Sequence, residues 1–465
     1  MTLPATHSVS RTYLYFAATA AALGGILFGF DIAVINGALV FLRKQFMLSD
    51  GQTELAASSL LAGCVIGASL AGALSDRFGR KKVLLGAAVL FLVSSLGAAI
   101  PRNLSGFVAA RVAGGLAIGM ESMLAPLYLA EISPARLRGR LVSLHQLAIV
   151  GGILVAYFVS WALTSLGDGA WRWMFASAVL PSFLFVLAFL TAPESPRWLV
   201  KQGRDVEAGV VLEKIGEDAP ARLRDIQAAL AEEGGSWREL LSPALRKPLR
   251  IAVALAVLQQ VTGINTILFY GSLLLTEHVS GQTASSALGA NVLIGVVNVI
   301  TTIVAIGAID RLGRKPLLMA ASGGMAVCMF LLGLILWLAP GAALLIIGLI
   351  LTTVACFGVG LGPGVWVVLS ELFPTRVRGR AMSVATISLW SACVLLTFTF
   401  LTLVKAITAT GAFWVYASLC VFTFWFIWKQ TPETKGKTLE EIERTWLSHA
   451  PVLPASGAQA ASDRH

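Results

Sequence analysis

The chain has 465 residues, of which 57% are hydrophobic and only 13% are charged, and its mean hydropathy is +0.80. A soluble globular protein carries about twice that charged fraction, so the composition excludes an ordinary soluble domain and indicates a membrane protein. The net charge is +10, but the basic residues stand in short clusters between apolar runs. Such clusters orient membrane helices, and we therefore expect no nucleic-acid partner.

Twelve apolar runs follow one another along the chain, six before a polar insert and six after it. They cover residues 12–42, 53–75, 83–101, 105–130, 141–163, 172–192, 249–275, 285–309, 316–338, 341–370, 380–404 and 410–428. A helix needs about 20 residues to cross a bilayer, and in lipid it satisfies its own backbone hydrogen bonds. The pattern predicts an all-α membrane protein with twelve transmembrane helices.

Three short motifs recur at nearly the same interval, with offsets of 234, 240 and 239 residues. They are Asp76-Arg-Phe-Gly-Arg with Asp310-Arg-Leu-Gly-Arg, Glu131…Arg138-Gly-Arg with Glu371…Arg378-Gly-Arg, and Pro193-Glu-Ser with Pro432-Glu-Thr. A steady offset indicates two parallel, pseudo-symmetric six-helix halves. Such halves pack around a site near the membrane midplane and rock against each other.

Basic loops alternate with loops that carry little charge. The basic ones, residues 76–82, 133–140, 310–316 and 374–380, follow every second span. The positive-inside rule puts them, and both termini, in the cytoplasm. We expect an N-terminal half (1–192), a cytoplasmic helical linker (193–247), a C-terminal half (248–430) and a cytoplasmic tail (431–465). Within the linker, 205–215 and 221–233 show helical periodicity with one apolar side, and the tail is expected to be disordered from about residue 448.

Six motifs occur together in a fixed order: DRFGRKK (76–82), PESPRWL (193–199), QQVTGIN (259–265), GPGVW (362–366), ELFPTRVRG (371–379) and PETKG (432–436). Because of these motifs and their order, the chain resembles the sugar porter family of the major facilitator superfamily over nearly its whole length. The resemblance implies a multi-pass transporter of the inner or plasma membrane that moves a monosaccharide by alternating access. It also implies a monomer in the lipid bilayer that needs no cofactor or metal and is driven by the proton gradient.

One acidic residue, Asp31, lies within the first apolar run, where a charge costs about 2.5–3.5 kcal/mol on insertion scales. Asp31 lies about nine residues before the outer end of the first helix, and Arg111 lies about six residues after the outer end of the fourth. At about 1.5 Å rise per residue, both side chains lie about 9–14 Å below the outer surface and can pair. The pair can alternate between an ionised, bridged form and a protonated, released form; the alternative is a static ion pair. The resemblance agrees with proton coupling, because proton-coupled members keep this Asp whereas uniporting glucose facilitators have an amide.

A sugar ring needs neutral hydrogen-bonding groups and a flat apolar surface. Gln259, Gln260 and Asn265 would not share one narrow face of a straight helix, but Gly263 permits a break, as at many transporter sites. By the resemblance, the sugar-binding set is Phe28, Gln146, Gln259, Gln260, Asn265, Asn298, Gly362, Trp366 and Trp390, in which Gly362 and the two tryptophans form the close wall and stacking faces and Phe28 closes over the ring. The alternative is that the buried amides only join helices.

Two positions depart from the family pattern. Sugar porters usually have Gln or Asn just before Trp390, where this chain has Leu389, and a second Gln seven residues after Gln146, where it has Ile153. Two polar contacts to the ring are therefore missing. This leaves the identity of the sugar open rather than the class of substrate.

The basic loops also hold acidic residues, which positive-inside orientation alone does not explain. We predict a cytoplasmic gate made of Asp76, Arg80, Glu131 and Arg138 in one half and Asp310, Arg314, Glu371 and Arg378 in the other. Each set can pair within its half. Contacts between the halves would latch the outward-open state and break on opening inward.

Two further titratable residues, Glu121 and His145, lie within apolar runs. Glu121 is either a second proton site or a carboxyl kept neutral by burial, and we favour the second; His145 is expected to pack or hydrogen-bond. The chain has no nucleophile triad, phosphate-binding loop or metal-ligand spacing, so we predict neither an enzyme nor an ATP-driven pump. The sequence favours a proton-coupled sugar symporter (hexose or pentose). The alternatives are a facilitative sugar or polyol uniporter and a non-transporting sugar sensor.

Overall fold

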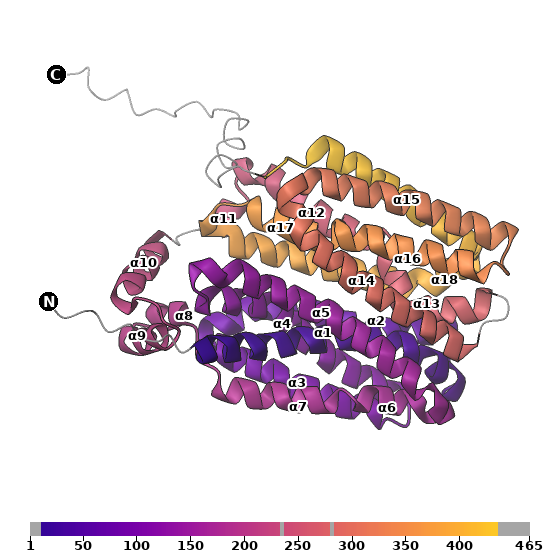
Figure 1. Ribbon diagram of the computed structural model, residues 1–465, viewed down its shortest axis with the longest axis horizontal. Coiled ribbons are helices and arrows are strands. Elements are labelled where there is room, and N and C mark those ends of the chain that lie inside the picture. Colours follow the sequence, from indigo (N-terminus) through magenta and orange to yellow (C-terminus); the bar gives the residue numbers. More distant parts are fainter. Residues whose placement is uncertain (1–10, 233–236, 280–282, 436–465) are drawn as a thin grey trace, which may run out of the picture.

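The computed structural model describes residues 11–232, 237–279 and 283–435, and within them the protein is a bundle of long helices (Figure 1). Ten helical runs in these ranges are long and apolar enough to cross a membrane. Two of them, Gly139–Thr191 and Val377–Gln430, contain 53 and 54 residues, about twice what one crossing needs. Each of these holds two spans, so the twelve predicted spans are present.

The first six spans form the N-terminal half, drawn indigo to magenta in Figure 1. Its helices are α1 (Arg11–Gln45), α2 (Asp50–Phe78), α3 (Arg80–Ala99), α4 (Leu104–Ile132), α5 (Ala135–Ala162), α6 (Ala170–Ala176) and α7 (Val179–Thr191). A 3-10 helix over Leu163–Gly169 joins α5 to α6, and Gly167 within it has a φ of 70° that interrupts the helical run. The sixth predicted span therefore consists of the two helices α6 and α7.

The second six spans form the C-terminal half, drawn pink through orange to yellow in Figure 1. Its helices are α12 (Pro243–Val261), α13 (Ile264–His278), α14 (Ala284–Leu312), α15 (Arg314–Leu338), α16 (Ala343–Val359), α17 (Leu361–Glu371) and α18 (Thr375–Gln430). Two spans here are broken: α12 continues as α13, and α16 as α17. The long α18 is interrupted at Ile407 and Thr408, where Thr408 has a φ of 67°, and it supplies the last two spans.

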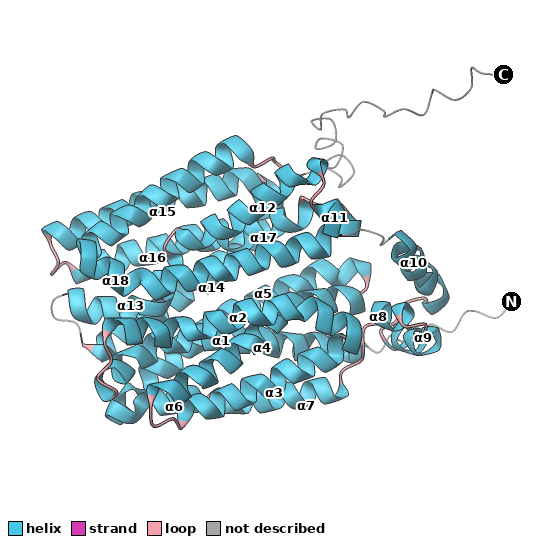
Figure 2. Ribbon diagram, turned by 180° about the vertical axis from the view of Figure 1, so that it is seen from behind, coloured by secondary structure: helices cyan, strands magenta, loops and turns pink. Residues whose placement is uncertain are grey.

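Four short helices connect the halves: α8 (Pro196–Lys201), α9 (Asp205–Lys214), α10 (Ala219–Glu232) and α11 (Trp237–Leu240). The two linker helices predicted at 205–215 and 221–233 correspond to α9 and α10, up to residue 232. Helices α8 to α10 share a small core that includes Trp198, Leu212 and Ile226. All four lie at one end of the bundle in both views (Figures 1 and 2). We call this the linker end and the other the opposite end.

Helices α2 and α4 touch backbone to backbone. A side-chain carbon added at Gly63 would collide with the carbonyl oxygen of Val112, and one added at Gly115 would collide with that of Leu60. Small residues allow this approach, which supplies much of the packing energy between helices in lipid. The close contact holds α4, and with it Arg111, in a fixed position inside the N-terminal half.

Candidate transport site

The buried acid–base pair joins α1 to α4. Arg111 Nη1 donates to Asp31 Oδ1 at 2.8 Å, and Arg111 Nη2 donates to the Asp31 backbone oxygen, also at 2.8 Å. Arg111 is fully buried and Asp31 is 3% exposed, so each charge depends on the other for compensation. The guanidinium also lies 5.2 Å from the centre of the Phe175 ring of α6, a cation–π distance. The expected contact is formed, and its role in proton coupling stays a prediction.

The break at Gly263 brings the three predicted amides of the C-terminal half together. Gly263 has a φ of 86°, and a side-chain carbon there would meet the Tyr416 ring at 2.7 Å. Across the break, Asn265 Nδ2 donates to Gln260 Oε1, and Gln260 Nε2 donates to Gln259 Oε1 at 3.2 Å. The amides thus form one hydrogen-bonded chain although their sequence positions would separate them on a straight helix.

This amide chain is anchored at both ends to neighbouring helices. Gln259 Nε2 donates to the carbonyl oxygens of Leu361 (2.7 Å) and Gly362 (3.0 Å), at the start of α17. Asn265 Nδ2 lies 3.1 Å from Cys393 Sγ of α18. Such bonds also join helices, so the geometry agrees with a polar sugar site and with the structural alternative alike.

Two of the predicted aromatic residues, one from each half, contact each other. The rings of Phe28 (α1) and Trp390 (α18) are 5.9 Å apart and tilted by 48°. Trp390 is 5% exposed, and within the described residues its indole Nε1–H has no hydrogen-bond partner. A buried donor without a partner costs free energy, so this N–H is a candidate contact for a bound polar molecule, and that role stays a prediction.

The other predicted sugar contacts lie on three further helices. Gln146 (α5) and Trp366 (α17) are half-buried, and Asn298 (α14) is buried. Asn298 Oδ1 is 3.5 Å from the point that a Gly358 side-chain carbon would occupy. Their contribution to one site with the amide chain stays a prediction.

The predicted gate residues pair within each half at the linker end. Arg80 binds Glu131 through two bonds of 3.0 and 3.2 Å and lies 3.4 Å from Asp76. Arg314 repeats this with Glu371, at 3.3 and 3.0 Å, and with Asp310, at 3.2 Å. Arg378 donates to the Phe373 carbonyl at 3.3 Å, and the Arg138 side chain lies outside the described residues. The two halves therefore carry the same acid–base cluster.

The sequence analysis missed one member of each cluster. Glu194 Oε1 accepts the first two backbone N–H groups of α3, at 2.9 and 3.1 Å, and Glu433 accepts those of α15, at 3.1 and 3.0 Å. A carboxylate at a helix N-terminus satisfies free N–H groups and matches the helix dipole. Gly79 and Gly313, which precede the two helices, share a φ of 96°. The sequence signal for these two glutamates was the Pro-Glu pair that recurs in both halves. The repeat alone did not reveal that the glutamates cap helices.

The Glu433 carboxylate illustrates how backbone donors stabilise a charge. Partial burial works to raise the pKa of Glu433, but N–H groups of Lys435, Arg314, Lys315 and Thr434 outweigh it and lower the pKa below its ordinary value. The charged form is thus favoured by the folded arrangement.

The two halves are joined at the opposite end by a polar seal between α1 and α13. Asn36 Nδ2 donates to the carbonyl oxygens of Leu268 (3.0 Å) and Ile267 (3.4 Å), and Asn36 Oδ1 accepts the Ser272 N–H at 2.8 Å. Tyr157 of α5 donates to the same Leu268 carbonyl at 3.2 Å. These residues are all buried, so the seal excludes water from this end of the interface.

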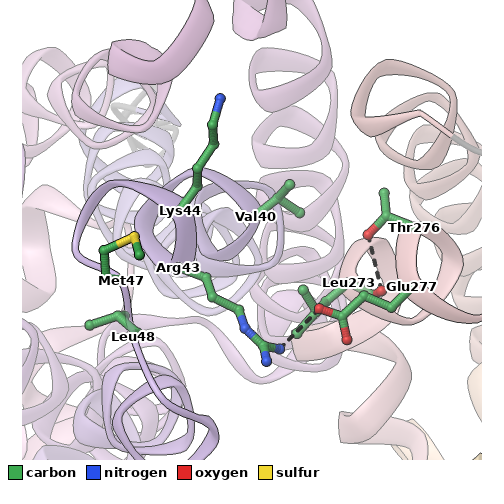
Figure 3. A pocket seen from close by; sticks show the side chains of 8 residues that line it. All are labelled: Val40, Arg43, Lys44, Met47, Leu48, Leu273, Thr276 and Glu277. Carbon is green, nitrogen blue, oxygen red and sulfur yellow. Dashed lines mark hydrogen bonds and ion pairs between the residues drawn. The ribbon is translucent and has the colours of Figure 1, made fainter.

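Charged residues surround the seal. Arg43 of α1 bonds Asp50 at 2.7 Å and Glu277 of α13 at 3.0 Å, and Glu54 of α2 accepts the backbone N–H (2.7 Å) and hydroxyl (2.9 Å) of Thr402 in α18. The Arg43–Glu277 pair borders a surface pocket lined by Val40, Arg43, Lys44, Met47, Leu48, Leu273, Thr276 and Glu277 (Figure 3). The pocket contains none of the predicted sugar residues. The structure is closed at the opposite end.

Glu121 and His145, predicted separately, lie together. Glu121 Oε1 is 3.6 Å from His145 Nε2, and both residues are buried. Glu121 Oε1 would also lie 2.7 Å from a side-chain carbon at Gly24 of α1. The choice between a second proton site and a neutral carboxyl stays open.

The protein is a transporter of the major facilitator fold. It has two six-helix halves, of which one holds a buried acid–base pair and the other a chain of amides at a helix break. A family model described as "Sugar (and other) transporter" matches residues 17–446. The chain belongs to this family of multi-pass membrane proteins.

Relatives resemble the chain over nearly its whole length. The arabinose-proton symporter of Bacillus subtilis is 39% identical and covers 96% of this chain and 97% of its own. The D-xylose-proton symporter of Escherichia coli is 37% identical over 94% and 96%, and the glucose transport protein of Synechocystis is 39% identical over 94% and 99%.

Solved structures of the xylose transporter XylE from E. coli have the same fold. Its partially occluded inward-open conformation matches with a TM-score of 0.82 and 34% identity, covering 92% of this chain and 100% of that one. Its inward-open conformation matches with 0.81 and 35%, covering 93% and 100%.

Trp366 provides a test of the predicted sugar site. We expect Trp366→Ala to abolish sugar binding measured by calorimetry while the bundle stays folded, because the change removes a stacking face. Gln260→Ala should weaken binding by about 1–3 kcal/mol, the cost of leaving polar groups unpaired. The control is Trp173→Ala, which removes an indole that is 62% exposed on α6. Unchanged affinity in Trp366→Ala would show that the site is wrongly assigned.

Glu433 provides a pH test of the linker-end clusters. Because its pKa is lowered in the folded protein, its stabilisation is fully present above its ordinary pKa of about 4.3 and is lost as pH falls through the folded value. We expect Glu433→Gln to lower the thermal unfolding midpoint at pH 7 and the difference from wild type to shrink as the pH falls below about 4. Glu213→Gln, on the exposed side of α9, is the control. A pH-independent difference would contradict the electrostatic explanation.

Proposed function

We propose that the protein is a proton-coupled monosaccharide symporter of the cytoplasmic membrane, working by alternating access between its two halves. The observation that carries the proposal is the buried Asp31–Arg111 pair. A sugar site alone does not require an ionised acid at this depth. An acid whose charge is removed by proton binding, beside a base that it otherwise neutralises, couples a proton to a change of structure.

The cycle follows from the charges. When Asp31 is ionised, its bond to Arg111 holds α1 against α4. When Asp31 binds a proton, the attraction is lost and α1, which also carries Phe28 and Asn36, is released from α4. Phe28 touches Trp390 and Asn36 forms the seal. Proton binding thus acts on the helix that contacts both the sugar residues and the closing interface.

The proton gradient supplies enough free energy for accumulation. One charge crossing about 180 mV releases about 4 kcal/mol, at about 2.3 kcal/mol per 100 mV. At about 1.4 kcal/mol per tenfold change, this supports a concentration ratio of about 10³. A uniporter supports none, so concentrative uptake separates the two functions.

The substrate that we propose is a pentose or a hexose. Neutral amides, an unpaired indole N–H and flanking aromatic rings suit an uncharged hydroxylated ring, and similar proteins carry the names of arabinose, xylose and glucose transporters. We propose that the protein acts as a monomer, needs no cofactor, and has both termini in the cytoplasm with the linker end. The closed opposite end would then be the extracellular one.

The gate proposal assigns alternate roles to the two ends. At the linker end, the clusters of Arg80 and Arg314 bond within their own halves here, which leaves the halves free to separate. In the outward-facing state the linker ends approach, and we propose that charges of one cluster then contact the other. The Asn36–Ser272 seal would break in the same step.

Asp31→Asn tests proton coupling. We expect this variant to bind sugar and to exchange labelled sugar in counterflow, because the amide fixes the neutral form. It should accumulate no sugar against a gradient when a proton gradient is imposed on the same proteoliposomes. Asp168→Asn, an exposed acid at the opposite end, should behave as wild type. If Asp31→Asn still accumulates sugar, the coupled proton binds at another residue, and Glu121 and His145 are the next candidates.

Leu389→Gln tests specificity. Leu389 is buried next to Trp390 and stands where the family resemblance places a polar ring contact. We expect Leu389→Gln to change the ranking of pentoses and hexoses in competition uptake rather than a rate common to all. An equal effect on every sugar would show that Leu389 contributes packing alone.

A further inference from the structure

The Asp31 carboxylate uses only one of its oxygens in the pair with Arg111. Oδ1 accepts the guanidinium N–H, whereas Oδ2 is buried and has no partner among the described residues. A buried carboxylate oxygen without a partner is costly, because it has lost its bonds to water. Oδ2 is also an oxygen on which a coupled proton can reside.

A second unpartnered group lies close to this oxygen. Ser94 of α3 is fully buried, and its hydroxyl has no hydrogen-bond partner among the described residues. A side-chain carbon at Gly114 of α4 would collide with Ser94 Oγ and would lie 3.1 Å from Asp31 Oδ2. The two oxygens therefore border the same small space, which is open only because residue 114 has no side chain.

We propose that Ser94 is the third member of the proton-coupling site, with its hydroxyl hydrogen-bonding to Asp31 Oδ2 in the space beside Gly114. A hydroxyl both donates and accepts. The two groups are not bonded to each other in this structure. A small side-chain shift into the space beside Gly114 lets the hydroxyl donate to Oδ2 when Asp31 is ionised and accept from the carboxylic acid when Oδ2 carries the proton. Ser94 is therefore a positioning residue that serves both states of the acid, whereas Arg111 serves only the ionised one.

Among the described residues, the polar groups near Asp31 are few. Arg111 of α4 occupies Oδ1, and the Cys64 thiol of α2 also lies near enough to interact electrostatically with the pair. From α6, the Phe175 ring faces Arg111. Gly114 adds no polar side chain, so the hydroxyl of Ser94 is the group placed to reach Oδ2.

The next residue, Ser95, provides a matched control on the same helix. It is also buried, but its hydroxyl donates to the Phe91 carbonyl at 2.8 Å and lies 3.4 Å from Ser182 Oγ. Ser94 and Ser95 differ in partner rather than in residue type, helix or burial. A general effect of deleting a buried hydroxyl would appear at both positions.

The test measures the pH dependence of proton-driven uptake of labelled xylose in proteoliposomes. The bond that Ser94 donates to the carboxylate is stronger than the one it accepts from the neutral acid, so losing both makes Asp31 hold its proton more tightly. In Ser94→Ala we expect the external pH of half-maximal uptake to rise by about one unit, the size set by the difference between a hydrogen bond to a charged group and one to a neutral group. Ser95→Ala should keep the wild-type profile. Ser94→Thr and Ser94→Val introduce side chains of the same shape, but only threonine keeps a hydroxyl. If the hydroxyl matters rather than packing, only Ser94→Val should shift the pH profile.

The inference rests on the proposed symport, and the outcomes separate the two. If wild type shows no concentrative uptake of xylose, arabinose or glucose under a proton gradient, the proposed function fails. If wild type accumulates sugar and the Ser94→Ala and Ser94→Val profiles match it, the role of Ser94 is overturned. An equal shift in Ser95→Ala, or in Ser94→Thr, would likewise overturn it, because the effect would then not belong to this hydroxyl.

Discussion

The structure depends on the need to neutralise a charge at Arg111, a fully buried base in α4. Its compensation comes from α1, through the carboxylate and the backbone oxygen of Asp31, and from the Phe175 ring. Removing one partner of such a pair costs several kcal/mol, since it leaves a buried charge alone. The contact between α1 and α4 is therefore strongest when Asp31 is ionised, and this dependence underlies the switch role that we propose for it.

The two halves repeat their linker-end chemistry but differ in their centres. Arg80 with Glu131 and Arg314 with Glu371 occupy matching places, and a glutamate caps the adjacent helix in both halves. These clusters tie neighbouring helices together within each half at that end. The central polar groups are not repeated, because the acid–base pair belongs to one half and the amide chain to the other.

Helix α13 links the amide chain to the closed end. It begins after the left-handed residue Gly263, carries Asn265 in its first turn, and carries Ser272 and Glu277 further along. A short helix that begins at a break can move more freely than a full-length span. The same element thus contacts the candidate sugar residues and the seal, and α1 contacts both from the other half. In the proposed cycle, ligand and proton would therefore act on the same two helices.

The sequence by itself determined the twelve spans, the two-fold repeat and the candidate pair of Asp31 and Arg111, because span length, hydropathy, loop charge and depth along a helix are local properties of the chain. The break at Gly263 was also evident from residue type and spacing. Only the tertiary structure decided which side chains face each other: Glu121 with His145, Asn36 with Ser272, Glu194 with the start of α3, and Ser94 with Asp31. These contacts depend on how each helix is rotated about its axis and on which helices it packs against. The packing of small residues such as Gly114 and Gly115 sets both, and no local sequence pattern records them.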